Sequence, residues 1–189
     1  QGADLATVTQ AAGQAIANMA SIGMSLDTCR MPGTAKEDRI PPGKAELGLG
    51  IHGEAGVQQV PHQNAAQAMD MMLDKLSAHL GDGPHVAILN NLGGTTPLEM
   101  SVLAHALATS PKAAQINHII GPAEMMTALD MHGFSLSIMP VTAQNEPLLQ
   151  AEVGVSAWPG MKGVGPAPVT PLPDGLSPIQ PIASQNPKV

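Results

Sequence analysis

Aromatic side chains and charges are scarce in this sequence of 189 residues. Phe134 and Trp158 are its only Phe, Trp or Tyr residues, and charged residues make up 12% of the chain. A platform that stacks single-stranded nucleic acid needs several aromatic rings, so that class of protein is excluded. The formal charge of −7 also argues against a phosphate backbone as ligand. We therefore expect no nucleic-acid partner.

Long apolar runs and paired cysteines are missing as well. No stretch reaches the roughly 18 apolar residues that a membrane-spanning helix requires, so we expect no membrane partner. Cys29 is the single cysteine, which excludes an intrachain disulfide and a cysteine-based metal site. This composition fits a reducing compartment, and we expect a cytoplasmic protein without a metal. The first residue is Gln1 and not Met, so we expect the chain to start inside a longer protein.

Helical and strand-like patterns alternate along residues 1–160. They predict an α/β fold, a layered domain in which helices cover a mixed or mainly parallel sheet. Helices are expected after the capping residues Asp4 (ending at Gly23) and Asn64, and at the capping box Thr96-Pro97-Leu98-Glu99. A further helix is expected over residues 122–132. Strands are expected at residues 24–29, 47–51, 86–89, 116–120 and 134–139, with a surface loop over residues 30–45.

Proline gathers toward the C-terminal end of the chain. Residues 163–189 hold seven prolines, and only Asp174 and Lys188 are charged there. Such a stretch cannot donate a full ladder of hydrogen bonds and has no helical period, which predicts an extended segment. We therefore divide the chain into a domain over residues 1–162 and a Pro-rich linker or tail over residues 163–189.

The first candidate site is the segment Glu46-Leu-Gly-Leu-Gly-Ile-His52-Gly-Glu54-Ala-Gly56. Its alternating large residues and glycines predict a strand that ends at His52. Ligands of open α/β sheets bind beyond the carboxyl ends of strands, and glycines let a small ligand approach the backbone. His52 is thus either a ligand-binding residue or an ordinary turn residue. The H-x-E triplet of zinc deaminases does not apply, because those proteins need a later P-C-x-x-C.

The second candidate is Asn90-Asn91-Leu92-Gly93-Gly94-Thr95-Thr96, a glycine-rich loop that leads into a helix. Such a loop either offers free backbone N–H groups to an anion or is a plain strand-to-helix turn. It matches neither a Walker loop nor a dinucleotide-binding motif.

The third candidate is residues 127–135, where Asp130 and His132 are expected together at a helix end. A histidine there is favourable without any function, so a structural role stays open.

These motifs, in this order and at these separations, resemble the ketone-binding subunit or domain of the dihydroxyacetone kinase family, in its C-terminal half. The resemblance runs from about Asp4 to Lys162. It implies that His52 adds through its imidazole nitrogen to the substrate carbonyl and forms a hemiaminal. Ala55 stands where the family often has Pro. The walls around the substrate are expected to be Gly50, Ile51, Gly53 and Glu54.

The resemblance also carries expectations for activity and partners. It implies phosphorylation of a short ketose such as dihydroxyacetone, with ATP and Mg²⁺ in a separate nucleotide-binding domain or subunit and no cofactor in this chain. The family's acid/base residues lie in the half that precedes this chain, so we expect these 189 residues alone to be inactive. A homodimer is expected. Two alternatives stay open: an erythrulose-type ketose kinase, and a non-catalytic ketone-sensing coactivator built on the same domain.

Overall fold

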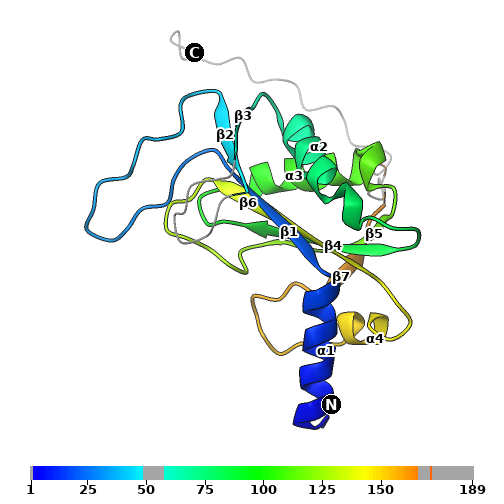
Figure 1. Cartoon of the computed structure of the whole chain (residues 1–189). Coiled ribbons are helices and arrows are strands. Elements are labelled where there is room, and N and C mark those ends of the chain that lie inside the picture. The colour runs from blue at the N-terminus through cyan, green and yellow to red at the C-terminus, as the bar shows by residue number, and fades with distance from the viewer. Residues whose placement is uncertain (1, 49–57, 166–170, 172–189) are drawn as a thin grey trace.

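The computed structural model describes residues 2–48, 58–165 and 171, which form one sheet with helices packed on it (Figure 1). The strands are β1 (Ala20–Ser25), β2 (Lys44–Leu47), β3 (Gln58–Pro61), β4 (His85–Asn91), β5 (Ile116–Ala123), β6 (Gly133–Pro140) and β7 (Met161–Gly163). The helices are α1 (Leu5–Asn18), α2 (Ala65–Leu76), α3 (Pro97–Thr109) and α4 (Glu146–Gln150), with 3-10 turns η1 (Ser77–His79) and η2 (Pro111–Ala113).

The seven strands lie in the order β3-β2-β1-β6-β4-β5-β7. Among the described strands only β4 and β5 pair in parallel, and every other neighbouring pair is antiparallel. The α/β class and the mixed sheet are confirmed, but the expectation of a mainly parallel sheet is wrong. Parallel neighbours need a crossover connection, and only α3 joins two neighbouring strands. The helix α2 instead joins β3 to β4, which are not neighbours.

The main core lies between the sheet and the pair α2 and α3, which cover the same face (Figure 1). Methionines fill much of it: Met69 and Met72 on α2 are both fully buried. Flexible thioether side chains suit irregular gaps, which explains a core with so few aromatic rings. A smaller cluster on Val86, Ile120 and Val141 includes partly buried residues such as Trp158.

The three predicted helix starts are confirmed. The side chain of Asp4 accepts from the Thr7 N–H at 2.8 Å, and that of Asn64 accepts from the Gln67 N–H at 2.9 Å. Both halves of the capping box between Thr96 and Glu99 are formed. These bonds join residues three apart in the chain, so the local sequence is enough to specify them.

Two other expectations are corrected. The first helix ends at Asn18, and the strand that follows starts at Ala20, because β1 pairs with β6 from Ala20↔Ile138 to Ser25↔Gly133. The expected helix over residues 122–132 is absent, since β5 runs to Ala123 and irregular chain follows.

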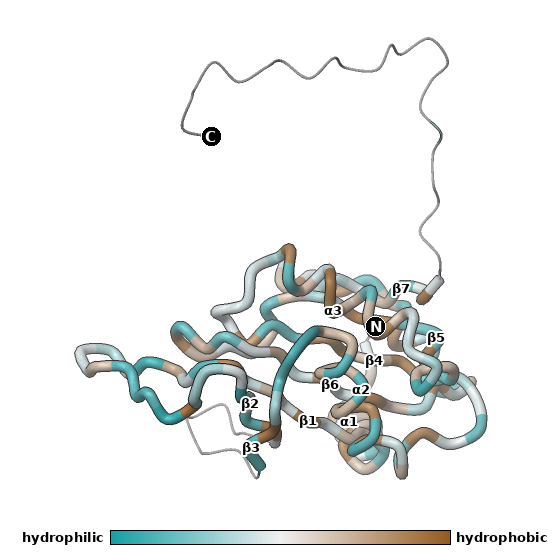
Figure 2. Tube along the Cα trace, turned by 90° about the horizontal axis from the view of Figure 1, so that it is seen from above, coloured by the Kyte–Doolittle hydropathy of each residue, from teal (hydrophilic) through white to brown (hydrophobic). Residues whose placement is uncertain are grey.

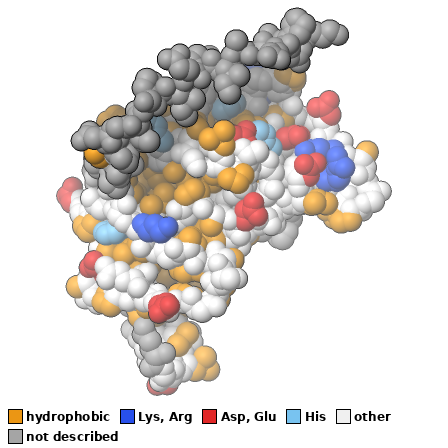
Figure 3. Space-filling model, turned by 180° about the vertical axis from the view of Figure 1, so that it is seen from behind, with side chains coloured by type: hydrophobic (Ala, Val, Ile, Leu, Met, Phe, Trp, Pro, Cys, Tyr) orange, Lys and Arg blue, Asp and Glu red, His pale blue; other side chains and the backbone are white. Residues whose placement is uncertain are grey.

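The segment between β1 and β2 extends away from the sheet as a mostly hydrophilic loop, as expected (Figures 1 and 2). Charged side chains of both signs gather on this side of the molecule (Figure 3). At the other end of the molecule α1 projects from the sheet, and none of its residues is buried. In the described part of the chain, no helix combines the length and apolar character needed to cross a membrane.

The strand β7 pairs with β5, and the Val164 N–H donates to the Asn117 carbonyl at 2.8 Å. Ordered pairing therefore reaches slightly beyond residue 162. Most of the predicted extended segment, residues 166–170 and 172–189, lies outside the described residues, so the division into domain and tail stays a prediction.

Candidate functional site

The predicted substrate-binding residues lie in the segment 49–57, outside the described residues. The strands that flank this segment are described: Leu47 pairs with Gln58, and the Gly48 N–H donates to the Gly23 carbonyl at 2.7 Å. The role of His52 therefore stays a prediction. The same holds for the predicted walls, Gly50, Ile51, Gly53 and Glu54.

A buried ion pair holds the strand that leads to this motif. Glu46 is only 3% exposed, and Arg39 donates to both of its carboxylate oxygens, from Nε to Oε1 at 3.2 Å and from Nη2 to Oε2 at 3.0 Å. The hydrogen bond to Glu46 raises the pKa of Arg39. This pair ties the hydrophilic loop to β2, so Glu46, the first residue of the motif, helps to hold the strand in place.

The glycine-rich loop after β4 has no free backbone donor between residues 92 and 96. The Asn91 side chain accepts from the N–H groups of Gly93 and Thr95, at 2.8 and 3.3 Å. The N–H groups of Leu92, Gly94 and Thr96 donate to Gly133 O, Met131 O and Glu99 Oε2. Since each donor already has an acceptor within the protein, the loop is a strand-to-helix turn and not an anion site.

Glycines let this loop cross the segment before β6 at close range. A Cβ on Gly93 would lie 2.7 Å from the Ala128 carbonyl oxygen, and one on Gly94 would lie 2.8 Å from the His132 nitrogen. Thr95 and Gly133 complete the crossing: Thr95 Oγ1 donates to Gly133 O at 2.7 Å and accepts from Gly133 N at 2.9 Å. The second and third sequence motifs are therefore in direct contact.

Asp130 and His132 are not brought together as a pair. Asp130 adopts a left-handed conformation (φ 62°) and faces Lys36 at 3.2 Å. His132 has a different partner, with its Nε2 3.0 Å from Glu99 Oε1. The expected helix end is absent, so the electrostatic argument for His132 there does not apply.

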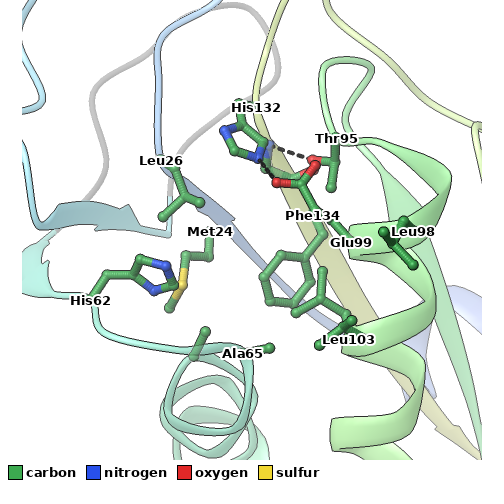
Figure 4. Close-up of a pocket in the computed structure, with 13 residues that line it drawn as sticks. Met24, Leu26, His62, Ala65, Thr95, Leu98, Glu99, Leu103, His132 and Phe134 are labelled. Atoms are coloured by element: carbon green, nitrogen blue, oxygen red, sulfur yellow. Dashed lines mark hydrogen bonds and ion pairs between the residues drawn. The ribbon is translucent and has the colours of Figure 1, made fainter. Parts of the chain in front are cut away.

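A pocket of about 310 Å³ lies beside His132, between the first turns of α2 and α3 (Figure 4). The ends of β1 and β6 form its floor. Its rim carries four polar residues, His62, Thr95, Glu99 and His132. Sequence reasoning missed His62 as a site residue, because it comes to line the same pocket as Glu99 and His132 only where two helices begin at the same end of the sheet. Among the described residues, no group of three His, Cys, Asp or Glu side chains is arranged to hold a metal.

The rim residues differ in their electrostatics. Burial lowers the pKa of His62, and the nearby His132 lowers it further. Within the described chain, His62 Nδ1 is buried and has no hydrogen-bond partner. The backbone and side-chain hydrogen bonds from Thr96 hold the pKa of Glu99 below its usual value. Both Glu99 oxygens are engaged, one by Thr96 and the other by His132.

The sheet order, the two helices on one face and the contact between the second and third motifs define a mixed α/β domain with its loops gathered at one end of the sheet. Residues 1–157 match the Dak1 domain, and the chain belongs to this family.

Two relatives of the chain are named as kinases of short ketoses. It is 44% identical over 161 residues to the dihydroxyacetone kinase of Citrobacter freundii, which covers 84% of the chain and 29% of that protein. It is 34% identical over 164 residues to the D-erythrulose kinase of Mycolicibacterium smegmatis, covering 84% of the chain and 28% of that protein. The chain thus spans less than a third of these relatives.

The structure agrees with these sequence matches. It superimposes on the crystal structure of the C. freundii dihydroxyacetone kinase in complex with AMP-PNP and Mg²⁺ with a TM-score of 0.84. Identity in that comparison is 39%, and the match covers 97% of this chain and 35% of the other. The fold expected from the resemblance is confirmed.

Proposed function

We propose that this chain is the ketose-binding part of a dihydroxyacetone kinase. The observation that carries the proposal is the G-I-H-G-E motif at residues 50–54 within a Dak1 domain. The 44% identity to a protein named dihydroxyacetone kinase supports it. In this function His52 binds the substrate covalently, and Gly50, Ile51, Gly53 and Glu54 surround it.

The chemistry at His52 needs only a neutral imidazole. Its lone-pair nitrogen adds to the carbonyl carbon of the ketose, and the carbonyl π electrons move to the oxygen. The proton of the other ring nitrogen is lost to solvent while the oxygen gains one, so the hemiaminal keeps every atom of the ketose. The adduct positions the substrate for phosphoryl transfer and rejects glycerol, which has hydroxyls but no carbonyl.

The nucleotide is assigned to another domain or subunit. The C. freundii relative was crystallised with AMP-PNP and Mg²⁺, and this chain matches only 35% of it. We therefore assign ATP and Mg²⁺ to a separate nucleotide-binding domain or subunit, and we expect the complete protein to form a homodimer. The 189 residues alone should not consume ATP in the presence of dihydroxyacetone.

D-erythrulose is the second candidate substrate, because a relative 34% identical is named for it. It has the same carbonyl chemistry and one carbon more. Competition between the two ketoses for the adduct, at equal concentration, distinguishes them: the natural substrate should occupy the larger fraction of the protein.

The His52 adduct is tested by non-denaturing mass spectrometry of the complete natural protein with dihydroxyacetone. The expected mass gain is one whole ketose, without loss of water, and it should be absent from His52→Ala. His79→Ala, which changes an exposed histidine of η1, should keep the adduct. Adduct occupancy should also fall in acidic solution, because imidazolium has no lone pair. An unchanged adduct in His52→Ala would overturn the proposal.

A further inference from the structure

Helix α1 receives little support from the rest of the described structure. It projects from the sheet (Figure 1), none of its residues is buried, and only Ala11 and Ala15 are partly buried. Gly13 lies near its middle, where glycine weakens a helix. A helix of 14 residues is marginal in water unless an apolar face packs against something. We therefore expect α1 to gain stability from a partner on its exposed side.

The exposed side of α1 carries an apolar stripe. Spacings of three and four residues place its members on one face of the helix and its C-cap. The most accessible of them are 82% and 72% exposed, so the stripe is open to a partner. We call these residues the α1 stripe: Leu5, Val8, Ala12, Ile16 and Met19.

The residues of the α1 stripe are placed symmetrically about Ala12. Val8 and Ile16 each lie four residues from it, and Leu5 and Met19 each lie seven residues from it. When two copies of α1 pack antiparallel across a two-fold axis at Ala12, Val8 faces Ile16 of the second copy and Leu5 faces Met19. Large apolar side chains then meet on both sides of the axis. At the axis the small Ala12 lets the two backbones approach closely.

The charge of the helix also favours a second copy as the partner. No residue from Leu5 to Asn18 is charged, although each chain carries a formal charge of −7. A charged surface would repel its own copy, whereas this helix does not. An antiparallel arrangement also brings opposite ends of the two helix dipoles together. The same lack of Lys and Arg disfavours an anionic membrane, which attracts these residues beside an apolar face.

We propose that the α1 stripe is the contact between two copies of this chain, which pack antiparallel with the two-fold axis at Ala12. A standard interface has about 20–30 residues a side, and the α1 stripe has far fewer, so the dimer should be weak, with a Kd on the order of 100 μM. The proposal gives the homodimer expected above a contact surface. It does not depend on the chemistry at His52, so either proposal can fail without the other.

Sedimentation velocity of the 189-residue chain, from about 10 μM to about 1 mM, tests the proposal. We expect a shift from monomer to dimer as concentration rises. Ile16→Glu should abolish this shift, because each copy would bury a carboxylate against apolar side chains without a partner. Gln10→Glu is the matched control. Gln10 is exposed on the opposite face of the same helix, so the same added charge there should leave the dimer intact.

A second variant tests the antiparallel arrangement. Val8→Lys alone should also stay monomeric. In an equimolar mixture with Ile16→Glu, the introduced ammonium group faces the introduced carboxylate at one contact, and native Ile16 faces native Val8 at the other. The mixture should therefore form dimers again, which also shows that both variants are folded. Parallel helices would place position 8 against position 8, and mixing would then restore nothing.

Four results would overturn the proposal: a parent chain that stays monomeric at about 1 mM, a dimer that survives Ile16→Glu, a dimer that Gln10→Glu disrupts equally, or a mixture of the two variants that stays monomeric. An α1 stripe that is covered by another part of the complete protein instead of by a second copy would give the first of these results.

Discussion

At the scale of single residues, Gly133 allows close packing of two chain segments at the end of the sheet, and Asn91 pairs the polar backbone groups there. Gly133 lies so close to β1 that an added Cβ would collide with the Met24 carbonyl oxygen and with Ser25 Cα at 2.8 Å. Asn91 is buried and satisfies two backbone donors of the turn, while its own amide donates to the Thr95 carbonyl at 2.7 Å. Two hydrogen bonds between Thr95 and Gly133 then join the second and third motifs, which lie about 40 residues apart in the chain.

Gly133→Ala should therefore lower the free energy of unfolding by about 3 kcal/mol, because backbone atoms on both sides cannot move aside. Gly13→Ala is the matched control: Gly13 lies in α1 with nothing within 4 Å of an added Cβ. There the same substitution should be neutral or stabilise by up to about 1 kcal/mol. Urea unfolding of both variants measures the two values, and equal effects would contradict the close approach at Gly133.

At the scale of elements, the start of α3 combines a local cap with a tertiary contact. Glu99 accepts from Thr96 N at 2.8 Å and from Thr96 Oγ1 at 2.7 Å, within its own helix turn. Its other oxygen lies 3.0 Å from His132 Nε2, on the chain just before β6. The hydrogen bonds from Thr96 are the main reason that the pKa of Glu99 is lowered.

A carboxylate whose pKa is lowered in the folded protein stabilises the fold at pH values above its unfolded-state pKa, which is 4.5 for glutamate. That stabilisation is lost as pH falls through the lower, folded-state pKa. Glu99→Gln should therefore lower the free energy of unfolding by about 0.5 kcal/mol near neutral pH, a modest effect because the side chain is 46% exposed. The difference from the parent should shrink below pH 4.5. Urea unfolding across this range measures it.

Glu152→Gln is the control for this series, since Glu152 is exposed and lies outside the helices. It should show no such pH-dependent difference. A Glu99→Gln difference that stayed constant down to low pH would mean that the carboxylate charge does not stabilise α3.

At the scale of the whole molecule, the two hydrophobic clusters are covered by different parts of the chain. The helices α2 and α3 cover the main core, while the smaller cluster depends on chain that follows β6, including Trp158 and Met161. The strand β7 pairs with β5 through His118↔Gly163, Ile119↔Lys162 and Ile120↔Met161. Residues 161–164 therefore contribute to the fold.

Shortening the chain tests this boundary. A chain that ends at Gly165 should keep the unfolding midpoint of the parent, because the composition of the removed residues predicts an extended segment. A chain that ends at Pro159 loses β7 and exposes the edge of β5, which should cost about 2 kcal/mol. Thermal unfolding of both chains gives the comparison. A much lower unfolding midpoint for the chain that ends at Gly165 would show that the Pro-rich segment packs on the domain.

The candidate site was predictable only in part. The sequence identifies the G-I-H-G-E segment through its resemblance to a family, and His52 lies outside the described residues, so its role stays a prediction. The sequence singled out His132 and Glu99 separately, but it gave no sign that they share a pocket with His62, because the three residues lie on different parts of the fold and share no spacing. The anion-binding alternative for the loop after β4 failed because its donors already have acceptors. Asn91 and Glu99 supply local ones, and the carbonyls of Met131 and Gly133 are brought to the loop only by the folded chain.

The sequence by itself determined the helix starts, the α/β class and the family. Each helix start is stabilised by hydrogen bonds within one turn, such as that from the Thr7 N–H to Asp4. The stability of the helix start therefore depends on residues that are neighbours in the chain. Tertiary structure alone decided where α1 ends, which strands run antiparallel, and that residues 124–132 are not helical. The ladder from Ala20 to Ile138 joins residues more than 100 positions apart, and its hydrogen bonds outweigh a helical pattern that only near neighbours support.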